Sequence, residues 1–152
     1  MKIRLSFFLL FLSLAVNAQS NLNDLLPKDP NTITGVLSNG MHYYIRKNSK
    51  PEHRAELRLA VNAGATSEND DQQGLAHFTE HMAFNGTEGF KKNELIDYLE
   101  SVGTKFGPHL NAYTSFDETV YMIQIPTDKQ EIVDKGLQIL ENWSMHLGVD
   151  RI

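Results

Sequence analysis

The chain has 152 residues, 41% of them hydrophobic, and a formal charge of −5 from 14 basic and 19 acidic residues, which is the composition of one ordinary globular domain. This acidic balance, without any cluster of basic residues, argues against a surface that follows the phosphates of a nucleic acid. Because the sequence contains no cysteine, it excludes disulfides, iron–sulfur clusters and thiolate zinc sites, and any transition metal must be held by His, Asp or Glu.

The N-terminus has the pattern of a secretory signal peptide. Lys2 and Arg4 precede an apolar run from Leu5 to Val16, and Val16-Asn17-Ala18 offers small residues at the two positions that a signal peptidase reads. The alternatives are a buried helix or a membrane anchor, but about twelve residues at about 1.5 Å each are too short to cross roughly 30 Å of hydrocarbon. We therefore interpret residues 1–18 as a cleaved signal. This predicts an exported protein, with the periplasm as the expected compartment, and no transmembrane anchor after cleavage.

A lead-in segment and three strands are predicted next. Residues 19–30 are polar and punctuated by proline, and we assign no function to them. A β-hairpin is expected because β-branched residues from Thr32 to Leu37 precede Asn39-Gly40, a strong hairpin signal, and alternating side chains follow it. The run from Ala55 to Val61 also alternates polar and apolar side chains, and it is expected to join the same sheet as a third strand.

A helix is predicted over residues 71–82, because Asp70 and Asp71 suit the positive N-terminal end of a helix. One side of this helix is apolar and is expected to enter the core: Leu75, Phe78 and Met82. An apolar stripe predicts a second helix over residues 92–102, and alternating side chains predict strands over residues 105–113 and 119–125.

A long amphipathic helix is predicted to end at Gly148, and Thr127 with Gln130 forms a capping box at its start. Its apolar positions are Ile132, Val133, Leu137, Leu140, Trp143 and Leu147. Strands before and between helices, with hairpin-like neighbours, predict an α+β fold in which helices pack on a largely antiparallel sheet.

The chemistry of the chain concentrates in His77-Phe78-Thr79-Glu80-His81. At about 3.6 residues per turn, His77 and His81 lie roughly 40° apart on one helix face, with Glu80 beside His77. Imidazoles at this spacing suit zinc, and a nearby carboxylate can take a proton from water and pass it to a leaving amine. The pattern predicts hydrolysis of peptide bonds by a zinc-activated water, with Zn²⁺ on His77 and His81 and with Glu80 as general base. The alternative is a chance grouping of surface residues.

The order His-x-x-Glu-His is the inverted zinc motif of the inverzincins. The stretch from Gly74 to Thr87 resembles the motif region of the pitrilysin and insulinase (M16) metallopeptidases. The resemblance continues in the same order through 37–41, 62–64, 110–114 and 118–121. It implies that residues 31–152 are the N-terminal part of an incomplete pitrilysin-type metallopeptidase domain.

The resemblance also implies roles for residues of the site. In the family the two motif histidines bind zinc and the motif glutamate is the general base, which here are His77, His81 and Glu80. An Asn-Ala pair on an edge strand holds the substrate backbone in the family, so the resemblance implies substrate binding by Asn111 and Ala112. Without the resemblance, Asn111 would be interpreted as a turn or strand-end residue. His109 is two residues away and could line the same cleft.

Further parts of the family's site are expected outside this sequence. The family's third zinc ligand is a glutamate on a later helix, which the resemblance places beyond Ile152. A second pitrilysin-type half, which closes over a peptide or unfolded-protein substrate, is also expected downstream. Two other functions stay open at this point: a non-catalytic pitrilysin-like binding or scaffold protein, and an inactive truncated fragment.

Overall fold

The structure is a computed structural model that describes residues 27–91 and 93–147. The predicted signal peptide, residues 1–18, lies outside the described residues, as does most of the predicted lead-in segment. The chain divides into two units, residues 1–48 and residues 49–152. None of the helices in the described ranges has the length and apolar character needed to span a bilayer.

The described residues of the first unit form a β-hairpin. Strand β1 (Thr32–Val36) pairs antiparallel with β2 (His42–Arg46). At the turn, Gly40 has a φ of 87°, and the Oδ1 of Asn39 accepts a hydrogen bond from the Met41 N–H. The predicted hairpin and its Asn39-Gly40 turn are therefore confirmed.

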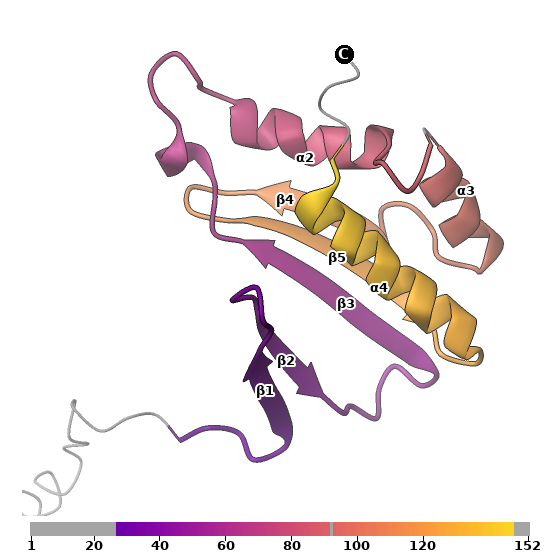
Figure 1. Cartoon of the computed structure of the whole chain (residues 1–152). Coiled ribbons are helices and arrows are strands. Elements are labelled where there is room, and N and C mark those ends of the chain that lie inside the picture. The colour runs from indigo at the N-terminus through magenta and orange to yellow at the C-terminus, as the bar shows by residue number, and fades with distance from the viewer. Residues whose placement is uncertain (1–26, 92, 148–152) are drawn as a thin grey trace, which may run out of the picture. The chain divides into compact units, whose positions relative to one another are not determined.

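The second unit is built on a three-stranded antiparallel sheet with the strand order β3-β5-β4 (Figure 1). Strands β3 (Arg54–Val61) and β4 (Leu110–Thr114) each pair with the central β5 (Thr119–Pro126). The expectation that residues 55–61 join the hairpin sheet is wrong, because β1 and β2 form a sheet of their own and this strand belongs to the sheet of β4 and β5. Among the described strands, β3 and β4 form the two edges of this sheet.

Three helices pack against this sheet: α2 (Leu75–Asn85), α3 (Glu94–Ser101) and α4 (Gln130–Met145). In Figure 1, α4 runs along β5 and β3. Buried side chains from helices and from alternate strand positions form a single core cluster: Leu59, Ala83, Phe90, Leu95, Leu99, Leu110, Tyr121, Ile123, Ile125, Ile132, Ile139 and Trp143. Because these strand positions share one face, the helices form one layer and the sheet the other. The predicted α+β fold is confirmed.

The long helix α4 differs from its prediction at its start. The capping box between Thr127 and Gln130 is wrong, since the helix begins after Lys129 and has no side-chain hydrogen bond at its cap. The Thr127 N–H donates to the carbonyl of His53 instead. This bond ties the end of β5 to the start of β3, so Thr127 belongs to the sheet connection and not to the helix.

The predicted apolar side of α4 is largely confirmed, since Ile132, Val133, Leu140, Trp143 and Leu147 lie in the core or pack against it, and Leu137 is the exception. Leu137 is 52% exposed, whereas Gly136 and Ile139 are buried. A Cβ atom at Gly136 would lie 2.7 Å from the Cδ1 of Ile125 and 2.9 Å from that of Leu57. The glycine therefore allows the helix backbone to approach the sheet closely, and this close approach decides which side of the helix is buried.

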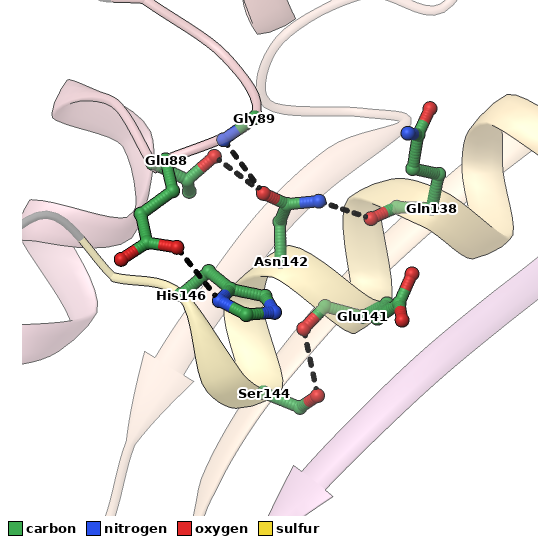
Figure 2. A network of polar contacts seen from close by, with 8 residues as sticks. Glu88, Gly89, Gln138, Glu141, Asn142, Ser144 and His146 are labelled. Carbon is green, nitrogen blue, oxygen red and sulfur yellow. Dashed lines mark hydrogen bonds and ion pairs between the residues drawn. The ribbon is translucent and has the colours of Figure 1, made fainter.

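A polar network joins the C-terminal end of α4 to the loop after α2 (Figure 2). The Oδ1 of the buried Asn142 accepts hydrogen bonds from the Gly89 N–H at 2.9 Å and from the Thr87 hydroxyl at 3.1 Å. Its Nδ2 donates to the Gln138 carbonyl at 2.9 Å. The Asn142 amide thus satisfies two donors of the loop and fixes that loop to the helix.

Replacing Asn142 with alanine is expected to destabilise this unit by about 2–3 kcal/mol, because the Gly89 and Thr87 donors lose a common acceptor. Hydrogen exchange of the α4 amides in the full-length gene product measures this change. Ser144→Ala is the matched control, since the half-buried Ser144 donates to the Glu141 carbonyl one turn back and not to the loop after α2 (Figure 2). The control is expected to change stability by less than about 0.5 kcal/mol. Equal effects of the two substitutions would contradict the assigned role of Asn142.

Candidate functional site

Helix α2 carries the predicted zinc ligands, and Glu68 determines where it starts. The Glu68 carboxylate accepts hydrogen bonds from the Gly74 and Ala76 N–H groups, both at 2.7 Å. These bonds satisfy donors that lack a partner at a helix start, and they hold the pKa of Glu68 below its usual value, the bond to Ala76 most strongly. The helix begins at Leu75, so the predicted start at Asp71 is wrong by about one turn.

The side of α2 that faces the core is not the predicted one. The expectation that Leu75, Phe78 and Met82 enter the core is wrong: Leu75 is 51% exposed, Phe78 is 45% exposed, and Met82 is partly buried but does not belong to the core cluster. The buried residues of the helix are Glu80 and Ala83. Because Ala83 has a small side chain, the helix can lie close to the sheet on this side. Glu80 is therefore enclosed between α2 and the sheet.

His77 and His81 lie together on the exposed surface of α2. Their Nε2 atoms are 3.0 Å apart, and their ring planes meet at 63°. Zinc bonds to imidazole nitrogen at about 2.0–2.1 Å, so both Nε2 atoms are close enough to each other to bind one zinc ion. In residues 27–91 and 93–147, no group of three or more His, Asp or Glu side chains lies close enough to hold a metal ion. The two histidines thus fit part of a zinc site.

The side chain of Glu80 extends from α2 toward strand β4 and is mostly buried. Its side chain is 8% exposed, and its Oε2 accepts a hydrogen bond of 2.8 Å from the Thr114 hydroxyl. Burial and, second, the negative charge of Glu80 raise the pKa of Tyr121 to about 12. Tyr121 therefore stays protonated at neutral pH, and Glu80 has a neutral aromatic neighbour and one fixed donor.

Asn111 and Ala112 lie on β4, an edge strand of the described sheet. The Ser115 N–H donates to the Glu118 carbonyl on the β5 side, so hydrogen bonds to β5 fall at odd-numbered positions of this strand. The backbone groups of Ala112 consequently point to the open edge, where its N–H donates to the Oδ1 of Asn111 at 2.9 Å. The structure places both residues where an extended peptide can add to the sheet.

His109 lies in the turn before β4 and is not brought together with His77, Glu80 and His81 of α2. Its Nδ1 accepts the Lys105 N–H at 3.2 Å, and its own N–H donates to the Lys105 carbonyl at 3.0 Å. These bonds form a turn over residues 105–109, so β4 begins at Leu110 and the predicted start at Lys105 is wrong. His109 lines a pocket with Asn111 and Met122, on the sheet face away from α2.

Thr114 is a site residue that the sequence analysis did not single out. It follows Ala112 by two positions, and side chains two apart in a strand share a face. This two-residue spacing from Ala112 could have identified Thr114 in the sequence, because it places the Thr114 hydroxyl on the same face as Ala112, toward α2.

Comparison with known proteins gives a consistent set of relatives. Residues 43–150 match the family model described as insulinase (peptidase family M16). The chain is 41% identical over 145 residues to the probable zinc protease PqqL of Haemophilus influenzae, a match that covers 94% of this chain and 16% of that protein. It is 44% identical over 117 residues to the zinc protease PQQL-like protein of Arabidopsis thaliana, covering 77% of this chain and 12% of that protein.

Among solved structures, the first half of the periplasmic protease PqqL from Escherichia coli matches with a TM-score of 0.78 at 40% sequence identity. This match covers 82% of the present chain and 26% of that one. The chain therefore spans only a small share of the length of the relatives that it matches.

Proposed function

Because the chain belongs to the insulinase family of peptidases, peptidase family M16, we propose that it is part of an exported zinc peptidase. Membership confirms the resemblance seen in the sequence. The proposed reaction is hydrolysis of peptide bonds in peptides or unfolded proteins. The observation that carries the proposal is that α2 brings the facing nitrogens of His77 and His81 together on the same helix as the enclosed carboxylate of Glu80.

The zinc site proposed here uses His77 and His81 as two of its ligands, through their Nε2 atoms. A third ligand is expected from a carboxylate outside the described residues, because catalytic zinc sites keep three protein ligands and one open position. When bound, zinc polarises the scissile carbonyl and lowers the pKa of a water molecule.

Glu80 acts as the general base in this proposal. Its Oε2 is engaged by the Thr114 hydroxyl, which leaves Oε1 to accept the proton from the attacking water. The water oxygen bonds to the carbonyl carbon, the carbon–nitrogen bond breaks, and Glu80 delivers the proton to the leaving amine. The Glu80 side chain is 8% exposed, so bulk water has little access to it.

Asn111 and Ala112 bind the substrate backbone in this proposal. A peptide that adds to the edge of β4 pairs with the outward N–H and C=O of Ala112, and a small side chain there allows close approach. In the structure the Ala112 N–H donates to the Asn111 side-chain oxygen. When a substrate binds, this N–H donates to a carbonyl of the substrate instead. Main-chain pairing makes little demand on side chains, which fits a broad range of peptide sequences.

We also propose that the chain forms part of an N-terminal half, with a second half downstream that closes over the substrate. The relative from Escherichia coli is named as the first half of a periplasmic protease, which supports this arrangement. Residues 31–152 would then be the first part of the peptidase domain, and the signal at residues 1–18 would direct it to the periplasm.

Metal removal tests this function. The full-length gene product is expected to cleave an unstructured fluorogenic peptide, to lose nearly all activity after dialysis against 1,10-phenanthroline, and to recover it when Zn²⁺ is added. Recovery with Mg²⁺ alone is not expected, because that ion prefers oxygen ligands over imidazole. A zinc-loaded protein that cleaves neither this peptide nor unfolded casein would favour a non-catalytic binding protein.

A further inference from the structure

We propose that Thr114 is a positioning residue for Glu80, which fixes the carboxylate so that its second oxygen meets the attacking water. This inference rests on the proposed peptidase function and concerns how one of its groups is oriented. The hydrogen bond from Thr114 Oγ1 to Glu80 Oε2 is 2.8 Å long and joins β4 to α2 across 34 positions of sequence. In a mostly buried site, such a charge-assisted bond restricts the rotation of the carboxylate.

The proton of the Thr114 hydroxyl is directed to Glu80 by its surroundings. The Oγ1 of Thr119, the partner of Thr114 in the last pair of the β4–β5 ladder, lies 3.4 Å away. Thr119 donates its own proton to the Ala63 carbonyl at 2.9 Å. Each hydroxyl has a single proton, and a carboxylate oxygen only accepts hydrogen bonds. The proton in the bond between Thr114 and Glu80 is therefore the one on the Thr114 hydroxyl. The two hydroxyls therefore donate in different directions, Thr119 to the backbone after β3 and Thr114 to Glu80.

The backbone that carries Thr114 is held on both sides. Within the hairpin, the Ser115 N–H donates to the Glu118 carbonyl at 2.8 Å. From the segment after β3, the Ala65 N–H donates to the Ser115 carbonyl at 3.1 Å. These bonds limit the movement of the residue next to Thr114, so its hydroxyl is presented to Glu80 from a rigid position.

Thr114 also links the carboxylate to the edge that is proposed to bind substrate. By the alternation along β4, the backbone groups of Ala112 and Thr114 both point to the open edge. The Thr114 side chain, in contrast, points to α2 and Glu80. A peptide paired with β4 therefore lies in a fixed register relative to a carboxylate that the same strand orients, and this register places the scissile bond.

The test compares two substitutions in the full-length enzyme with an unstructured fluorogenic peptide as substrate. Thr114→Val keeps the shape but removes the hydroxyl, and it is expected to lower kcat by about 10–100-fold while KM changes by less than about threefold. Thr114→Ser keeps the donor, and it is expected to retain kcat within about threefold. Both variants should bind as much zinc as the wild type. A crystal structure of Thr114→Val should show the Glu80 carboxylate rotated or in several rotamers.

Thr79→Val is the matched control. Thr79 precedes Glu80 on α2, and its hydroxyl donates to the Leu75 carbonyl at 2.8 Å, so this change removes a hydroxyl near the site without touching Glu80. Its kcat is expected to stay near the wild-type value. If Thr114→Val fails to fold, Thr114→Ala takes its place with the same expected result.

The outcomes separate this inference from the proposed function. A Thr114→Val enzyme with wild-type kcat overturns the role of Thr114, while the peptidase function stands if the wild type is active and Glu80→Gln is not. Equal losses in the valine and serine variants, or loss of zinc in the valine variant, would show a merely structural role and also overturn it. A wild-type protein without peptidase activity would overturn the proposed function itself.

Discussion

Replacing Glu80 with glutamine is expected to lower kcat for peptide hydrolysis by about 10²–10⁴-fold, because an amide cannot accept the proton of the attacking water. Glutamine has nearly the same shape as glutamate, and its side-chain oxygen can still accept the hydrogen bond from Thr114. The facing nitrogens of His77 and His81 are unchanged, so zinc content is expected to equal that of the wild type. Steady-state kinetics together with metal analysis of the full-length enzyme measures both quantities.

The control for this change is Glu131→Gln. Glu131 is an exposed carboxylate in the first turn of α4, so its substitution removes the same charge from a different helix. Its kcat is expected to match the wild type. A Glu80→Gln enzyme that keeps kcat within about threefold of the wild type would rule out Glu80 as the general base.

The histidine pair shows which part of the site could be predicted from the sequence. A spacing of four residues fixes two side chains on one helix face by local geometry alone, and the structure brings the two Nε2 atoms together as that geometry requires. The hydrogen bond that orients Glu80 could not be predicted in this way. It depends on Thr114, which lies in a strand 34 positions later, and nothing local to α2 indicates that partner.

The strands show the same limit for the fold. Alternation located residues 55–61 and 119–125 as strands, because each strand has one face on the core and the period of two follows from backbone geometry. Alternation does not say which strands pair. The adjacent hairpin was the expected neighbour of β3, but its partner is β5, which follows after two helices and another strand.

The exposed side of α2 illustrates a further limit. Leu75 and Phe78 are apolar, and apolar character predicted that they face the core. The helix instead buries Ala83, because a small side chain permits the closest approach to the sheet, and the polar Glu80 is enclosed beside it. Periodicity therefore identified the helix, while the sizes of the contacting side chains decided which of its sides is buried.

Replacing Trp143 with alanine is expected to destabilise the second unit by about 3–5 kcal/mol, through the cavity left by the buried indole. The indole packs against Phe84 and Tyr121, with ring centroids 5.3 Å and 5.1 Å away. Its Nε1–H also donates to the Ala83 carbonyl at 2.9 Å. This carbonyl belongs to the last turn of α2, where carbonyls have no partner within the helix, so the substitution leaves it unsatisfied as well.

Leu137→Ala is the control for this prediction, because it truncates a large apolar side chain of the same helix that is mostly exposed. It is expected to cost less than about 1 kcal/mol. Hydrogen exchange of the α2 and α4 amides in the full-length protein measures both variants, and equal losses of protection would contradict the anchoring role of Trp143. Ala83 lies two residues after His81, so loosening the end of α2 should also weaken zinc binding in Trp143→Ala. Through this bond the buried indole holds the last turn of α2, directly after the pair of histidines whose Nε2 atoms are 3.0 Å apart.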